Sequence, residues 1–277
     1  MTEVAWPAPA KLNLMLRVVG RRTDGYHLLQ TVFQFIDLCD ELSFRVRDDG
    51  EVRRVNEVEG VPAHIDLTVR AANLLRSEAG CAAGADIRVE KRIPLGGGLG
   101  GGSSDAATTL VALNQLWGCG LDSPQLMRLG LQLGADVPIF VHGHAAWAEG
   151  VGEQFTDIEP ITPYYLLLAP AAHVDTGKIF QDPELTRNSP RITIRDFLAG
   201  THGNDCLAVV RRRYPEVAAA FDWLADKAEA RLTGTGACLY AACESRAEAE
   251  DLWRQRPDGL AGFVVRGVNR SPLLDAC

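Results

Sequence analysis

The chain has 277 residues, of which 47% are apolar and 23% are charged, and its formal net charge is −8. This composition is typical of a globular protein with a sizeable core, and the length suggests about two domains. The negative balance argues against a general nucleic-acid-binding face, because phosphate backbones bind basic surfaces. A local basic cluster around a small anionic ligand remains open.

The seven cysteines are scattered and form no CxxC pair, which disfavours a disulfide framework or a zinc site and indicates a reducing compartment. The N-terminal stretch shows no secretory signal, and the longest apolar run, near YYLLLAPAA, is too short to cross a bilayer. We therefore expect a cytoplasmic protein with no membrane or nucleic-acid partner. His142 and His144 would share one face of a strand as candidate metal ligands, but they lack a third partner.

The first predicted element is a strand over residues 11–19, KLNLMLRVV, where polarity alternates. Lys11 and Asn13 fall on one face of this strand, and the intervening leucines fall on the other. A turn at Asp24-Gly25 and a β-rich run over 31–38 follow, which predicts an antiparallel pair.

Further along the chain, helices and strands alternate without a repeated period, which indicates a mixed α/β or α+β fold. Gly80 is a plausible C-cap for the first helix, and a segment at 173–191 is expected to be rich in loops. A proline-containing stretch near 159–163 is the expected boundary between domains 1–160 and 161–277. The expected helices are 66–80, 103–117, 125–133 and 246–255, with more than one helix around 211–224, and the expected strands are 85–93, 164–170 and 263–268.

The run IPLGGGLGGGSSDAA, which begins at Ile93, is the strongest chemical signal in the sequence. It satisfies GxGxxG between a strand and a helix, but the acidic strand end of a dinucleotide-binding fold is missing. It has no lysine for a Walker A loop, and the chain has no HRD or DFG element of a protein kinase. A flexible linker would not lie between a strand and an apolar helix. The remaining interpretation is a polyphosphate cradle at a helix N-terminus near Ser104.

This loop resembles the P-x-G-x-G-L-G-[GS]-S-S-x-A motif of the GHMP kinases, which include galactokinase, homoserine kinase and mevalonate kinase. Three further stretches, PAKLNLMLRVVGRRTDGYHLLQTVFQ, GADVPIFVHGHAAWAEGVGE and LTGTGACLYA, occur in the family's order. They resemble the branch of the family that acts on cytidyl-diphosphate methylerythritol in non-mevalonate isoprenoid synthesis.

The resemblance implies an ATP- and Mg²⁺-dependent kinase that phosphorylates the 2-hydroxyl of the methylerythritol moiety. It also implies a two-domain α+β fold. The N-terminal domain would resemble ribosomal protein S5 domain 2, the C-terminal domain would be ferredoxin-like, and the active site would lie in the cleft between them. We expect a monomer or a weak homodimer whose partners are the small-molecule substrate and ATP.

The resemblance also assigns roles to individual residues. Lys11 and Asp136 match the catalytic pair. Asn13, Tyr26, His27, Thr176 and Phe180 match residues that bind substrate, with the aromatic residues and the histidine around the cytosine. Gly234-Thr235-Gly236 would lie against the glycine loop. The residues expected to bind ATP phosphates are Pro94, Leu95, Gly96, Gly97, Gly98, Leu99, Gly100, Gly101, Gly102, Ser103 and Ser104.

The chain departs from the family pattern at a few positions. Gly97 stands where many members have alanine, and Thr235 and Tyr240 stand where serine and phenylalanine are common. The glutamate that ligates Mg²⁺ in some members has no clear counterpart, so the metal ligands are unknown. The alternatives are a GHMP kinase for another metabolite, a catalytically silent sensor on the same fold, and a dinucleotide-dependent oxidoreductase.

Overall fold

The computed structural model describes residues 5–62, 65–200 and 203–276. The strands are β1 (Ala5–Arg21), β2 (His27–Arg47), β3 (Val52–Arg54), β4 (Gly84–Glu90), β5 (Ala146–Glu149), β6 (Gln154–Asp157), β7 (Tyr164–Ala169), β8 (Gly203–Asn204), β9 (Arg231–Leu232), β10 (Leu239–Cys243) and β11 (Ala261–Val268). The helices are α1 (Leu67–Ala79), α2 (Gly101–Leu116), α3 (Ser123–Leu133), α4 (Val137–His142), α5 (Thr176–Gln181), α6 (Ile194–Leu198), α7 (Leu207–Arg213), α8 (Pro215–Ala225) and α9 (Arg246–Arg254), with a short 3₁₀ helix at Pro272–Asp275.

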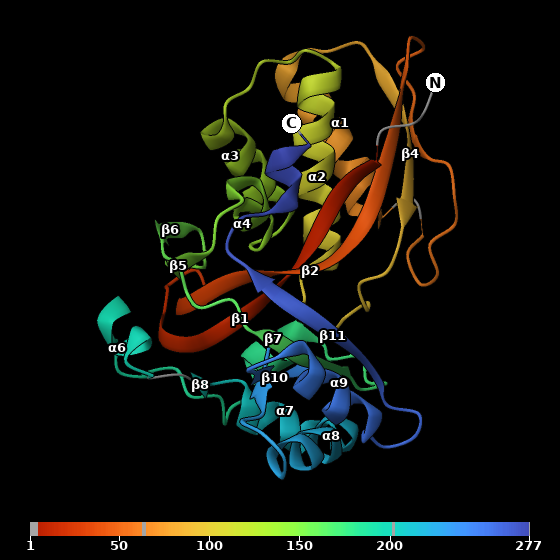
Figure 1. Ribbon diagram of the computed structural model, residues 1–277. Coiled ribbons are helices and arrows are strands. Elements are labelled where there is room, and N and C mark those ends of the chain that lie inside the picture. Colours follow the sequence, from red (N-terminus) through yellow and green to blue (C-terminus); the bar gives the residue numbers. More distant parts are fainter. Residues whose placement is uncertain (1–4, 63–64, 201–202, 277) are drawn as a thin grey trace.

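The strands of the described residues join in one sheet, ordered β3-β4-β2-β11-β7-β10-β9, with β1 paired to β2 and β8 and β5 paired to β2 and β6. Figure 1 shows α1 to α4 gathered at one end of the molecule and α7 to α9 at the other. Strand β11 connects the two ends, because Ala261 to Arg266 pair with β7 and the next two residues pair with β2. Each end therefore has its own helical layer, and a shared strand holds them together.

The long antiparallel pair of β1 and β2 crosses the middle of the molecule (Figure 1), as the sequence predicts. Its register shifts at three places, one of them between Asn13 and Met15. Both faces of β1 are buried there, since Leu12, Lys11 and Asn13 are each less than 5% exposed. The polar face of this strand thus lies inside the protein rather than at its surface.

The first predicted helix and its C-cap at Gly80 are confirmed. Asp66 accepts a hydrogen bond from the Thr68 backbone at the N-terminus of α1, and Gly80 ends the helix with a φ of +61°. Such a left-handed residue favours glycine, which has no Cβ to clash. The predicted strand 85–93 ends sooner, at Glu90, because Asp40 accepts hydrogen bonds from the backbone of Arg92 and Ile93.

One local expectation is wrong. The residues before His142 form the helix α4 rather than a strand, so His142 and His144 do not share a strand face. The segment 173–191 is largely irregular, as expected, and also contains the short helix α5, which begins where Asp175 accepts a hydrogen bond from the backbone of Lys178. Both helices are only six residues long. Periodicity is a weak signal over so short a stretch.

Candidate active site

A cavity of about 790 Å³ opens between the two ends of the molecule and is lined from both. The predicted residues that line it are Lys11, Asn13, Tyr26, His27, Asp136, Thr176, Phe180 and the loop from Pro94 to Ser103. Ser104 does not line it: this residue is fully buried, and its hydroxyl has no hydrogen-bond partner among the described residues. The predicted site residues therefore line a single cavity, except Ser104, which is buried next to the lining residue Ser103.

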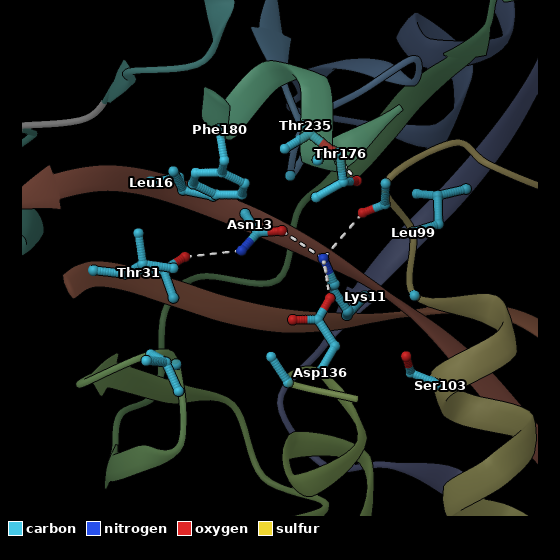
Figure 2. Close-up of a pocket in the computed structure, with 18 of the residues that line it drawn as sticks. Lys11, Asn13, Leu16, Thr31, Leu99, Ser103, Asp136, Thr176, Phe180 and Thr235 are labelled. Atoms are coloured by element: carbon cyan, nitrogen blue, oxygen red, sulfur yellow. Dashed lines mark hydrogen bonds and ion pairs between the residues drawn. The ribbon is translucent and has the colours of Figure 1, made fainter. Parts of the chain in front are cut away.

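Lys11 lies at the centre of the polar part of this cavity and is 2% exposed. Its Nζ is 3.2 Å from Oδ2 of Asp136 and donates to Oδ1 of Asn13 at 2.5 Å and to the carbonyl of Gly98 at 3.0 Å. Figure 2 shows these contacts converging on the ammonium. Its Nζ also lies 5.5 Å from the centre of the Phe33 ring. A buried ammonium needs such partners, and they fix its position.

Asp136 occupies the N-cap position of α4, but its side chain makes no capping hydrogen bond. By contrast, Asp66 and Asp122 at comparable positions use their carboxylates to cap the helices they begin. The carboxylate of Asp136 turns to Lys11 instead and remains 39% exposed toward the cavity. It is thus oriented by one contact and accessible to a ligand.

Asn13 is held from several directions. Its amide donates to the hydroxyl of Thr31 at 2.8 Å, and its backbone N–H donates to the hydroxyl of Thr233 at 2.9 Å. The hydroxyl of Tyr240 donates to its carbonyl at 3.1 Å. A phenylalanine at position 240 could not make this contact, so the tyrosine of this chain adds a support for the strand that carries Lys11.

The glycine loop packs directly against the stretch that contains Gly234 and Gly236, as expected. A Cβ at Gly98 would lie 2.4 Å from the carbonyl oxygen of Thr233, and the φ of Gly98 is +74°. Both the space and the backbone angle therefore require glycine at this position. A Cβ at Gly97 would lie 2.5 Å from Sγ of the buried Cys238, so the absence of a side chain at Gly97 leaves room for this cysteine.

Helix α2 begins at Gly101, two residues before the expected range 103–117, with Gly100 as its N-cap at a φ of +74°. The backbone N–H of Ser104 already bonds to the carbonyl of Gly100. The earlier N–H groups of the first turn have no partner within a helix and point out of its end. This geometry, next to loop glycines, suits an anionic phosphate group.

A buried ionic cluster lies behind the loop, and sequence reasoning missed it. Lys91 contacts Asp40 and Asp105, the latter at 2.7 Å, and both aspartates are buried. Desolvation by burial raises the pKa of Asp105 to about 7. Lys91 stands two residues before the loop run at Ile93, and only the fold shows that acidic residues surround it.

The opposite end of the cavity is aromatic. The rings of His27 and Phe180 stack with their centres 5.1 Å apart, although 153 positions separate them in the chain. Tyr26 is 64% exposed beside them. The hydroxyls of Thr176 and Thr235 lie 2.8 Å apart and connect α5 to the stretch beside the glycine loop. A planar ligand would find stacking area at this end.

The described residues hold no group of three or more histidine, cysteine or acidic side chains suited to a metal ion. His142 contacts Asp157 at 2.6 Å, and its ring centre is 5.7 Å from that of His144, outside the cavity. In the part of the chain that the structure describes, no helix is long and apolar enough to cross a membrane.

Comparisons with known proteins agree with this geometry. The GHMP kinases N terminal domain matches residues 66–144, and the GHMP kinases C terminal domain matches residues 187–261. The chain is 55% identical to a 4-diphosphocytidyl-2-C-methyl-D-erythritol kinase of Pseudomonas savastanoi over 98% of its own length and 94% of the relative's. It is 56% identical to the enzyme of the same name from Methylococcus capsulatus, over 98% and 93% of the two chains.

Among solved structures, a 4-(cytidine 5'-diphospho)-2C-methyl-D-erythritol kinase is 31% identical to this chain with a TM-score of 0.80. The match covers 96% of this chain and all of that one. A mevalonate kinase matches at 14% identity with a TM-score of 0.72, which shows the shared fold. The chain has the two-domain α/β fold of these kinases, and it belongs to the GHMP kinases and, within them, to the family of 4-diphosphocytidyl-2-C-methyl-D-erythritol kinases.

Proposed function

We propose that this protein transfers the γ-phosphoryl group of ATP to the 2-hydroxyl of 4-diphosphocytidyl-2-C-methyl-D-erythritol. The products are the 2-phosphate and ADP, and the step belongs to non-mevalonate isoprenoid precursor synthesis. The observation that carries the proposal is one cavity with a Lys11–Asp136 ion pair beside a glycine loop and a His27–Phe180 stack at its other end. Relatives of that name at 50–56% identity support the substrate.

Asp136 orients the substrate hydroxyl and accepts its proton in this proposal. Lys11 holds Oδ2, which leaves Oδ1 to face the hydroxyl. Phosphoryl-transfer transition states are loose, so positioning the oxygen in line contributes more than forming an alkoxide first. The Lys11 ammonium also faces the negative charge that spreads over the transferring group. Asn13 keeps Lys11 in place and lines the cavity for the substrate.

ATP fits the loop from Pro94 to Ser103, where positive-φ glycines expose backbone N–H groups at the start of α2. Mg²⁺ takes few protein ligands when phosphates supply most of its oxygens. The hydroxyl of Ser103 lines the cavity beside the cradle and is the protein oxygen that would meet it. When bound, Mg²⁺ would neutralise charge on the phosphates.

Coupled release of ADP tests the substrate directly. The purified chain would be assayed with ATP and, separately, with the cytidyl-diphosphate substrate, mevalonate, homoserine and galactose. We expect turnover with the first and none with the others. Turnover with one of the other three, and none with the cytidyl compound, would assign the chain to a different metabolite.

We further propose that the protein acts in the cytoplasm as a monomer or weak homodimer, with its domains meeting near residue 160. The six cysteines among the described residues are all free, which fits a reducing compartment. Light scattering across a range of protein concentrations would measure the oligomeric state, and a constant tetramer mass would contradict the proposal.

A further inference from the structure

Arg187 lies directly behind the aromatic end of the cavity and is not among the residues that line it. Its Nε donates to Nε2 of His27 at 3.1 Å. One of its terminal nitrogens donates to the carbonyls of Phe180 and Asp182 at 2.9 and 2.7 Å, and the other donates to the carbonyl of Leu185 at 3.1 Å. All three nitrogens of the guanidinium therefore make hydrogen bonds, which fix both His27 and the backbone of its stacking partner.

This contact determines where His27 carries its proton. A guanidinium has only donors, so the ring nitrogen that faces it must be an unprotonated acceptor. A neutral histidine with an unprotonated Nε2 carries its hydrogen on Nδ1. Partial burial, the charge of Arg187 and that of Arg21 all lower the pKa of His27, which keeps the ring neutral. No residue in the described ranges 5–62, 65–200 and 203–276 makes a hydrogen bond with Nδ1.

We propose that Arg187 is a positioning residue that holds His27 as the Nδ1–H tautomer, so that this ring nitrogen is a fixed donor for the acceptor edge of a cytosine. This inference rests on the proposed function, since it concerns how the same cavity selects its nucleobase. Arg187 acts through His27 and does not touch the ligand.

A fixed donor separates cytosine from uracil. Cytosine presents an unprotonated N3 on its pairing edge, whereas uracil carries a hydrogen at N3. An N–H aimed at this atom gains a hydrogen bond with cytosine and meets another N–H with uracil. A histidine free to exchange tautomers could accept from uracil as well as donate to cytosine. Arg187 removes that freedom, so the discrimination depends on a residue outside the cavity wall.

The kinetic test compares the ratio of kcat/KM for the cytidyl substrate and its uridyl analogue in the wild type, Arg187→Met and the control Arg191→Met. Arg191 is 57% exposed and pairs with Glu149. We expect Arg187→Met to lower the ratio about tenfold while the KM for ATP stays constant, and the control to match the wild type. Loosening of Phe180 alone would weaken both substrates equally and leave the ratio unchanged, and that result would overturn the proposal.

A spectroscopic test addresses the tautomer itself, by long-range ¹H–¹⁵N correlation of histidine rings in the full chain, with His27→Gln to assign the signal. We expect a neutral Nδ1–H ring in the wild type and exchange between tautomers in Arg187→Met. A neutral Nε2–H or a charged ring in the wild type at pH 7.5 would overturn the proposal, even if Arg187→Met fails to fold. Absence of cytidyl turnover by the wild type would instead refute the proposed function, while the tautomer would still be measured.

Discussion

The two ends of the cavity are built in different ways. At the phosphate end, Lys11 is 2% exposed and the glycine loop packs backbone against backbone at Gly98. At the aromatic end, Tyr26 is 64% exposed and stands at the tip of a hairpin, and Phe180 comes from a helix of six residues. At the end expected to perform chemistry, Lys11 is buried and the backbone is closely packed, whereas the end expected to recognise the nucleobase is more exposed. Catalytic geometry tolerates little displacement, while stacking tolerates more.

The largest effect should come from removing the charge of Asp136. Asp136→Asn keeps the shape of the side chain but cannot accept the hydroxyl proton, so we expect kcat to fall by about 100-fold or more. ATP binding, measured by titration calorimetry, should stay within about twofold because the cradle is unchanged. Asp122→Asn, which alters a carboxylate that caps α3, is the matched control. Near-wild-type turnover of Asp136→Asn would remove Asp136 from the mechanism.

The second largest effect is expected from adding a methyl group to the glycine loop at Gly98. In Gly98→Ala the new Cβ would meet a backbone oxygen at 2.4 Å, so the loop must shift. We expect the KM for ATP to rise about 10- to 50-fold. Gly118→Ala has a similar positive φ and nothing within 4 Å of its Cβ, so it carries the backbone strain without the clash. Equal effects of both substitutions on the KM for ATP would contradict the argument that the clash at Gly98 displaces the loop.

A smaller effect is expected from a substitution at the aromatic end of the cavity, and it should change the KM for one of the two substrates only. Tyr26→Ala removes stacking area, so we expect the KM for the cytidyl substrate to rise about 5- to 10-fold and the KM for ATP to stay constant. Ile161→Ala changes another exposed apolar residue, 82% exposed and away from the cavity, and should have no effect. A larger change in the KM for ATP would place the nucleobase elsewhere.

The smallest effect concerns stability and the cluster behind the loop. Burial raises the pKa of Asp105 to about 7, well above the ordinary value for an aspartate carboxyl group. The folded state therefore loses stability as the pH rises from about 4 through 7 and the buried carboxyl must ionise. Asp105→Asn removes this loss and leaves Lys91 paired with Asp40. We expect its melting temperature to exceed that of the wild type by about 3 °C at pH 8 and by less at pH 5. A gain that did not grow with pH would contradict the burial argument.

Much of the site could be predicted from the sequence because its residues lie in dense local motifs. In the glycine loop and in the turn at Asp136, the residues that indicate a function are adjacent in the sequence. The alternation around Lys11 shows which side chains share a face of the strand. The start of α2 at Gly101 was not predictable, because glycine has a low helix propensity and packing overrides it here. Neither was the burial of both faces of β1, since alternation predicts one exposed face.

Contacts between distant segments could not be predicted. Arg187 lies 160 positions from His27, and Lys91 lies 51 from Asp40, so no local pattern pairs them. The aspartates at helix N-termini also show that a local pattern does not determine the role of a side chain. Asp136 stands at a helix start like Asp66, and only the tertiary position of Lys11 determines that its carboxylate serves the cavity.

The hairpin of β1 and β2 links the two ends of the cavity. Lys11 and Asn13 lie midway along the hairpin, and Tyr26 and His27 lie at its tip, so one pair of strands carries residues that line both ends. The register of the two strands therefore sets the spacing between the two ends of the cavity. A slip of one residue would change this spacing and turn the side chains to the other face of the strand. A substitution in the turn that carries Tyr26 would therefore alter the aromatic end of the cavity and leave the strand positions of Lys11 and Asn13 unchanged.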